Sequence, residues 1–342
     1  MLLYRIVTAV LPSPPARKQR VAFTAAGLHV LSPAGLFLSA PYGESTFALL
    51  SFCGILSYIA ALKRRYSTVA QSGSRDALFT LFAGLCFGLA TMVRSNGLLY
   101  GIPFLFDALP LGIRLLFGPR LLRDVTKLAA TGLAGLLVAV GYALPQIVAY
   151  NEYCTGGNTR PWCSKHIPSI YSWVQDYYWD VGFLKYWTLP NIPLFLLATP
   201  MILLLLDTGF SALHHARAVL LAVNGEEPPS LRKSKEFQAQ KLVFARTMER
   251  LAVPQLVIAV MALTSFHVQI INRISSGYPI WYLILAISLQ DETPRLECGH
   301  SQAEHYNPFR RIRGKTREWI VRAMVAYAIV QGGLYASFLP PA

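Results

Sequence analysis

Long apolar runs separated by short basic segments are the feature that most constrains how this chain can fold. Of its 342 residues, 54% are hydrophobic and only 14% are charged, whereas a soluble domain carries about 25% charged residues. A helix needs about 20 apolar residues to cross a bilayer, and runs near that length recur along the whole sequence. The composition therefore predicts an all-α polytopic membrane protein. The net charge of +14 lies in basic loops, as membrane topology requires, so no nucleic acid is expected as a partner.

Nine transmembrane helices are predicted, and an apolar stub at residues 1–11 is expected to be the end of one more. The nine predicted spans are 21–40, 46–62, 77–93, 98–113, 128–150, 191–206, 251–271, 278–289 and 319–338. We expect them to form a single multi-pass membrane domain over residues 1–342. Several runs are shorter than a perpendicular span. Two interpretations stay open: inexact boundaries, or helices that stop short around a polar cavity.

The basic residues predict how the chain is oriented. If the nine spans alternate, one face holds only Arg94, Arg160, Lys165, Lys185 and Arg273. Basic loops stay in the cytosol, so the other face is the cytosolic one. This orientation predicts a lumenal aromatic loop at 151–190 and cytosolic basic loops at 207–250 and 290–318.

Four polar patches share the predicted lumenal face, at 41–45, 94–97, 151–190 and 272–276. Because each lies where the chain turns back, we expect one cavity with the loop 151–190 as its roof. Glu44 lies in the first patch. It is either a helix cap, favoured by the helix dipole, or a catalytic carboxylate at the rim of a site.

Arg94 and Asn96 belong to an Arg-Ser-Asn-Gly turn, and Arg273 precedes two serines near another turn. A guanidinium beside hydroxyls and an amide suits a phosphate or a sugar. The alternative is that each arginine only reaches the lipid headgroups.

The loop 151–190 carries two cysteines, Cys154 and Cys163, nine positions apart. An oxidising lumen favours a disulfide between them, and two free thiols are the alternative. His166 is the only histidine nearby, so no metal site is predicted here.

The same loop is dense in aromatic rings. Such rings collect at membrane interfaces whatever the function, but with amides and carboxylates they also suit a sugar or a polyprenyl headgroup. The candidate substrate-binding residues here are Trp162, Gln175, Asp176, Trp179 and Asp180. The spacing of Tyr171, Val174 and Tyr178 predicts an amphipathic helix lying along the membrane.

Several blocks, taken in order, resemble the GPI mannosyltransferase 2 family. They are LSPAGLFLSAPYGESTFALLSF at 31–52, VRSNGLLYGIPF at 93–104, PWC at 161–163 and YSWVQDYYWDVGFLKYWTLPNIPLFLLATPM at 171–201. No single block is decisive, but their combination and order are specific, and the resemblance covers nearly the whole chain.

The resemblance implies a GT-C-type glycosyltransferase of the endoplasmic reticulum membrane, active on its lumenal face. It implies transfer of the second mannose, through an α-1,6 bond, to a GPI-anchor precursor. The implied donor is dolichyl phosphate mannose and the implied acceptor is mannosyl-glucosaminyl phosphatidylinositol. No cofactor is expected, and divalent-metal dependence is left open. A small membrane subunit of the same complex is a further implied partner.

The chain departs from the family at its start. The family begins with a helix and a lumenal loop carrying a Trp-Asp pair, the expected source of the catalytic base. We expect this chain to begin after that loop, and Trp179-Asp180 matches a later block instead. Glu44 is then the best remaining catalytic carboxylate. Arg94, and Arg273 after it, would stabilise the departing phosphate.

Two other classes are weighed against a catalytic mannosyltransferase. A lipid or solute transporter would show inverted repeats and polar groups deep within helices, and neither is evident in the sequence. A non-catalytic or truncated subunit of a GPI mannosyltransferase complex is the second alternative. An assay with dolichyl phosphate mannose separates the enzyme from both.

Overall fold

The computed structural model describes residues 1–66, 74–118, 122–155, 160–224, 235–290 and 314–337, and within them every regular element is helical. The all-α prediction is therefore confirmed for this part of the chain. Six helical stretches are long and apolar enough to cross a membrane. They are α4 (Gly43–Tyr66), α5 (Ser74–Val93), η1 (Ser95–Tyr100) continued by α6 (Gly101–Phe117), α7 (Leu122–Cys154), α9 (Ile192–Asn224) and α10 (Lys235–Thr264).

The remaining three predicted spans have other structures. The run 21–40 is divided into α2 (Pro15–Val30) and α3 (Gly35–Ser39). Pro33 lies in the break, where it lacks a backbone donor and disfavours helix in the residue before it. The run 278–289 is α12 (Ile280–Gln290), which has 11 residues, nearly all buried, as in a core helix. The last is α13 (Gly314–Ala336), which begins among charged residues. The count of nine spans is thus not confirmed.

The stretch predicted as a cytosolic loop at 207–250 is largely helical. Helix α9 continues to Asn224, and α10 already begins at Lys235. Both extensions are rich in Ala, Leu, Arg, Gln and Glu, which are good helix formers even where they are too polar for lipid. Most of the other predicted basic loop, 290–318, lies outside the described residues.

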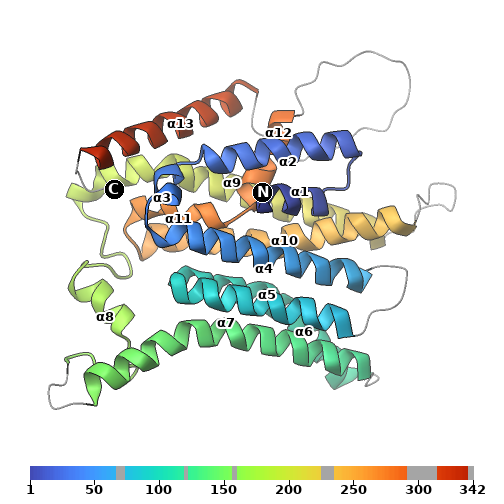
Figure 1. The fold of residues 1–342 in the computed structure, drawn as a ribbon, viewed down its shortest axis with the longest axis horizontal. Helices are drawn as coiled ribbons and strands as arrows, with labels where there is room; N and C mark the ends of the chain where they lie inside the picture. The colour runs from blue at the N-terminus through green and yellow to red at the C-terminus, as the bar shows by residue number, and fades with distance from the viewer. Residues whose placement is uncertain (67–73, 119–121, 156–159, 225–234, 291–313, 338–342) are drawn as a thin grey trace.

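Close approach of glycines holds α5 against α7. Figure 1 shows α4, α5 and α7 side by side, with α5 in the middle. A Cβ added at Gly141 of α7 would overlap the carbonyl oxygen of Gly88 in α5. Small residues let the backbones of two membrane helices approach, and packing between the helices then stabilises the pair.

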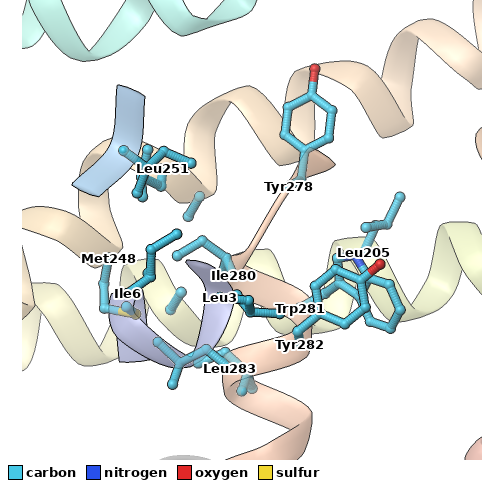
Figure 2. Close-up of a cluster of buried hydrophobic side chains, with 14 of the residues drawn as sticks. Leu3, Ile6, Leu205, Met248, Leu251, Tyr278, Ile280, Trp281, Tyr282 and Leu283 are labelled. Atoms are coloured by element: carbon cyan, nitrogen blue, oxygen red, sulfur yellow. The ribbon is translucent and has the colours of Figure 1, made fainter. Parts of the chain in front are cut away.

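The core lies where α1 (Leu2–Val10) and α12 meet α9 and α10. Figure 2 shows Leu3 and Ile6 of α1 gathered with Met248 and Leu251 of α10 and with the side chains of α12. Beside them, buried Gln255 of α10 donates to the carbonyl of Leu205 and accepts from the backbone N–H of Trp281. One amide side chain therefore joins α9, α10 and α12.

A buried ionic network crosses three helices at a place that the sequence analysis treated as apolar. Asp107 of α6 accepts from Arg65 Nη1 of α4 at 2.8 Å, from Arg250 Nε of α10 at 2.8 Å, and from the Tyr58 hydroxyl at 3.0 Å. All four side chains are largely buried. Buried polar groups therefore do lie among these helices, although they were not evident in the sequence.

Candidate active site

Glu44 lies between two arginines that come from distant parts of the sequence. Its Oε1 accepts from Arg94 Nη1 at 2.6 Å and from Arg273 Nε and Nη2 at 2.9 and 2.8 Å. The Glu44 side chain is 0% exposed, and its Oε2 has no hydrogen-bond partner among the described residues. The patches at 41–45, 94–97 and 272–276 therefore meet through ion pairs.

Helix ends place these three side chains. Glu44 is in the first turn of α4, where the helix dipole favours a carboxylate. Helix α5 ends at Val93, so Arg94 follows directly. Arg273 lies in the short helix α11 (Ile271–Ile274), and its guanidinium carbon is 4.3 Å from the ring centre of Phe37 and 5.0 Å from that of Tyr42. These cation–π contacts help to hold the guanidinium of Arg273 in place.

Stacked aromatic rings hold the turn at 94–97 against the segment that follows α11. Tyr100 stacks between Phe87 and Tyr278, with ring centres 4.6 and 5.5 Å apart. The Tyr278 hydroxyl donates to the carbonyl of Asn96 at 3.2 Å. Gly97 is needed here because a Cβ would lie 2.7 Å from the backbone nitrogen of Thr91.

A cavity of about 420 Å³ opens beside Arg94. Its walls come from the turn after α5, the middle of α7, helix α8 (Ile170–Tyr177) and the segment after α10. The polar and aromatic lining residues are Thr91, Arg94, Ser95, Asn96, Tyr142, Gln146, Tyr171, Gln175, Phe266 and His267. These elements lie toward the left end of the molecule in Figure 1.

Hydrogen bonds fix the loop 151–190 over this end of the helices. Gln146 Oε1 of α7 accepts from the Ser169 hydroxyl at 3.0 Å and from the Tyr171 N–H at 3.3 Å, where α8 begins. Trp187 Nε1 donates to the carbonyl of Leu263 at 2.7 Å. Cys154 and Cys163 form a disulfide. Helix α8 matches the amphipathic helix expected around Tyr171.

The structure brings some of the predicted substrate-binding residues to the cavity and leaves others apart. Arg94, Asn96 and Gln175 line it, whereas Glu44 and Arg273 lie behind its wall. Trp162 is buried against Tyr150, and Trp179 is exposed with its ring nearly perpendicular to that of His267. Asp176 and Asp180 pair with Lys185 at the surface. The hydrogen bond from Lys185 lowers the pKa of Asp176. These last four residues do not line the cavity.

Two further cavity residues, Gln146 and His267, were not predicted from the sequence. Desolvation lowers the pKa of His267 below its ordinary value of 6.5, and its Nε2 is buried without a partner in the described part of the chain. At neutral pH the imidazole is therefore uncharged. The sequence carried no signal for either residue, since both lie inside apolar stretches.

Helices of membrane-spanning length, with a polar cavity and a guanidinium at one end, define a multi-pass membrane protein. The chain belongs to the Mannosyltransferase (PIG-V) family, whose match covers residues 3–342. It is therefore a glycosyltransferase, as the sequence resemblance predicted.

The most similar relatives include proteins named GPI mannosyltransferase 2. That of Chaetomium globosum is 42% identical over 100% of this chain and 68% of its own length. That of Aspergillus oryzae is 40% identical over 100% of this chain and 71% of its own length. A Cricetulus griseus protein named GPI alpha-1,6-mannosyltransferase 2 is 32% identical over 81% of this chain and 58% of its own length. No solved structure matches.

Proposed function

We propose that this protein transfers the second mannose of the GPI-anchor precursor through an α-1,6 bond on the lumenal face of the endoplasmic reticulum. Dolichyl phosphate mannose is the donor, and mannosyl-glucosaminyl phosphatidylinositol is the acceptor. The family and the names of the relatives support the reaction. The observation that carries the proposal is Arg94 in the wall of a polar cavity at the ends of membrane helices, where a lipid-linked sugar phosphate can reach it.

Arg94 is proposed to meet the donor phosphate. Its Nη1 is engaged with Glu44, and the guanidinium has further N–H groups that can donate to phosphate oxygens. When the acceptor hydroxyl attacks the mannose carbon and gives up its proton to water, the bond from that carbon to the phosphate oxygen breaks and negative charge develops on the leaving phosphate. A guanidinium held in place beforehand stabilises that charge.

Glu44 is proposed to act through the arginines rather than on the sugar. The sequence predicted this carboxylate as the base that takes the hydroxyl proton. In the structure it is fully enclosed and does not line the cavity, so it would have to move to touch a hydroxyl. Its three hydrogen bonds instead fix the direction of both guanidinium groups. Glu44 is thus a positioning residue, and Arg94 contacts the substrate.

The test measures mannose transfer from dolichyl phosphate mannose in membranes of cells that lack second-mannose transfer and express this chain. Arg94→Ala should lower the rate by about 10²–10³-fold, as loss of one donor to a developing charge does. Asp176→Asn is the control, because Asp176 lies in helix α8, which contributes to the cavity walls, but its side chain does not line the cavity. Its rate should equal that of the wild type at equal protein level.

Two results would contradict the proposal. Arg94→Ala that transfers mannose as fast as Asp176→Asn would remove the arginine from the reaction. A wild-type chain that is inserted in the membrane and forms no product would favour a non-catalytic subunit instead.

A further inference from the structure

A second cavity lies at the opposite end of the helices from Glu44. It has a volume of about 260 Å³, and its walls come from the end of α1, the start of α2, the end of α4 and the start of α10. Lys63 of α4 lines it, 19 residues after Glu44, which corresponds to roughly 28 Å along the helix. These helix ends lie toward the right in Figure 1. This cavity shares no lining residue with the cavity beside Arg94, where mannosyl transfer is proposed.

The charges around this cavity do not balance. Lys18 and Lys63 both line it, and neither makes an ion pair with a carboxylate of the described part of the chain. Glu236 in the first turn of α10 is the acidic side chain in the described lining. Two ammonium groups and one carboxylate leave a net charge of +1. Gln240 adds an amide that can donate a hydrogen bond.

The apolar part of the lining fits a lipid rather than a freely soluble ion. Val10, Leu11 and Val243 are buried side chains that contribute to the walls. Lys63 stands near the end of α4, and the ends of membrane-spanning helices lie at the depth of the lipid phosphates. Lys18, near the start of α2, lines the same cavity. Lysines at that depth attract anionic lipids.

We propose that this cavity, which we call the Lys18–Lys63 pocket, binds the phosphodiester headgroup of an anionic phospholipid. The two ammonium groups contact the phosphate oxygens, and the buried apolar side chains contact the glycerol and the first acyl carbons. Glu236 repels the phosphate and limits the affinity. The pocket would stabilise the packing of α1 and α2 against α4 and α10, because a ligand that bridges them binds only the folded arrangement.

Native mass spectrometry of the detergent-purified chain with phosphatidylglycerol tests the proposal. Removing both charges with Lys18→Gln and Lys63→Gln should weaken binding about fivefold for each lysine, or ~30-fold together, if each ammonium contributes about 1 kcal/mol. Glu236→Gln should tighten binding, because it removes a repulsive charge. The pair Lys18→Arg and Lys63→Arg should retain binding, which separates loss of charge from failure to fold.

The matched control removes two exposed bases elsewhere, with Arg114→Gln and Arg123→Gln. This variant should bind phosphatidylglycerol like the wild type. The proposal is overturned if the control loses as much binding as the lysine variant, since the effect would then come from total charge. It is also overturned if phosphatidylethanolamine binds more tightly and Glu236→Gln weakens it, because the pocket would then select an amine. If equimolar inorganic phosphate displaced the lipid, the proposal that the pocket binds a phospholipid would be wrong, because the apolar part of the lipid would then contribute nothing to binding.

Discussion

At the residue scale, buried carboxylates have two different roles in this protein: orienting side chains beside a cavity and joining helices. Around Glu44, one carboxylate orients two guanidinium groups beside a cavity. Around Asp107, one carboxylate joins three helices. Each arrangement places two arginines on a single acid, so the acid in each case offsets two desolvated positive charges.

Asp107→Asn should strongly destabilise the protein. The amide has no charge, so Arg65 would lose its paired carboxylate and Arg250 would keep only the one from Glu249, at a cost of about 3–5 kcal/mol. The measurement is thermal unfolding in detergent. Asp176→Asn, which breaks an exposed pair with Lys185, is the control and should leave the unfolding temperature unchanged. Equal melting of the two variants would contradict the structural role of Asp107.

His267 predicts one component of the pH dependence of stability. Its pKa is lowered in the folded state by desolvation, so the unfolded chain binds a proton at higher pH than the folded one. Stability from this group is therefore fully present above the ordinary pKa of 6.5 and is lost as the pH falls toward the folded-state pKa. Melting temperatures of wild type and His267→Gln, compared at about pH 7.5 and 5.5, should show a smaller acid-induced drop in the variant. An identical drop would show that His267 does not contribute.

At the scale of elements, glycines decide how closely the membrane helices approach. Two glycines of helix α7 have contrasting surroundings. A Cβ at Gly141 would meet the backbone of Gly88, whereas a Cβ at Gly132 would have nothing within 4 Å. The contrast separates a packing effect from the general preference of a helix against glycine.

Gly141→Ala should destabilise the pairing of α5 and α7 by about 1–3 kcal/mol, because the methyl group overlaps a backbone carbonyl that cannot rotate away. Gly132→Ala should be neutral or stabilising by up to about 1 kcal/mol, because alanine is the better helix former. Unfolding in detergent measures both. If the two variants unfold at the same temperature, the close approach of α5 and α7 does not limit stability.

At the scale of the whole molecule, the two cavities lie at opposite ends of the same helices. Our orientation places the cavity beside Arg94 in the lumen and the Lys18–Lys63 pocket in the cytosol. It follows from the distribution of basic residues along the sequence. The geometry requires only that the two cavities face opposite sides.

Engineered glycosylation sites would determine this orientation. Lys165→Asn with Ile167→Thr creates an Asn-x-Thr site at exposed positions of the loop 151–190, and Glu226→Thr creates one at Asn224. Expressed in microsomes, the first should gain a glycan that an endoglycosidase removes, and the second should gain none. The reverse pattern would invert the orientation and place the reaction in the cytosol.

The sequence by itself determined the helical membrane class, the family and several residues of the candidate site. Apolar runs and a low content of charge leave a chain few alternatives to helices, because lipid cannot satisfy free backbone groups. Glu44, Arg94 and Arg273 stood out because charged groups between apolar runs are uncommon.

Only the tertiary structure decided which of these residues share a site. Arg94 and Arg273 are far apart in sequence, and local patterns do not show that both pair with Glu44. The same holds for Asp107, whose arginine partners come from α4 and α10. The aromatic residues of the loop 151–190 suggested substrate contacts at Trp162 and Trp179, which do not line the cavity. Trp and Tyr collect at membrane interfaces whatever the function, so their presence did not indicate where the cavity lies. The order of residues fixes what each helix can bury, whereas long-range packing fixes which charges meet.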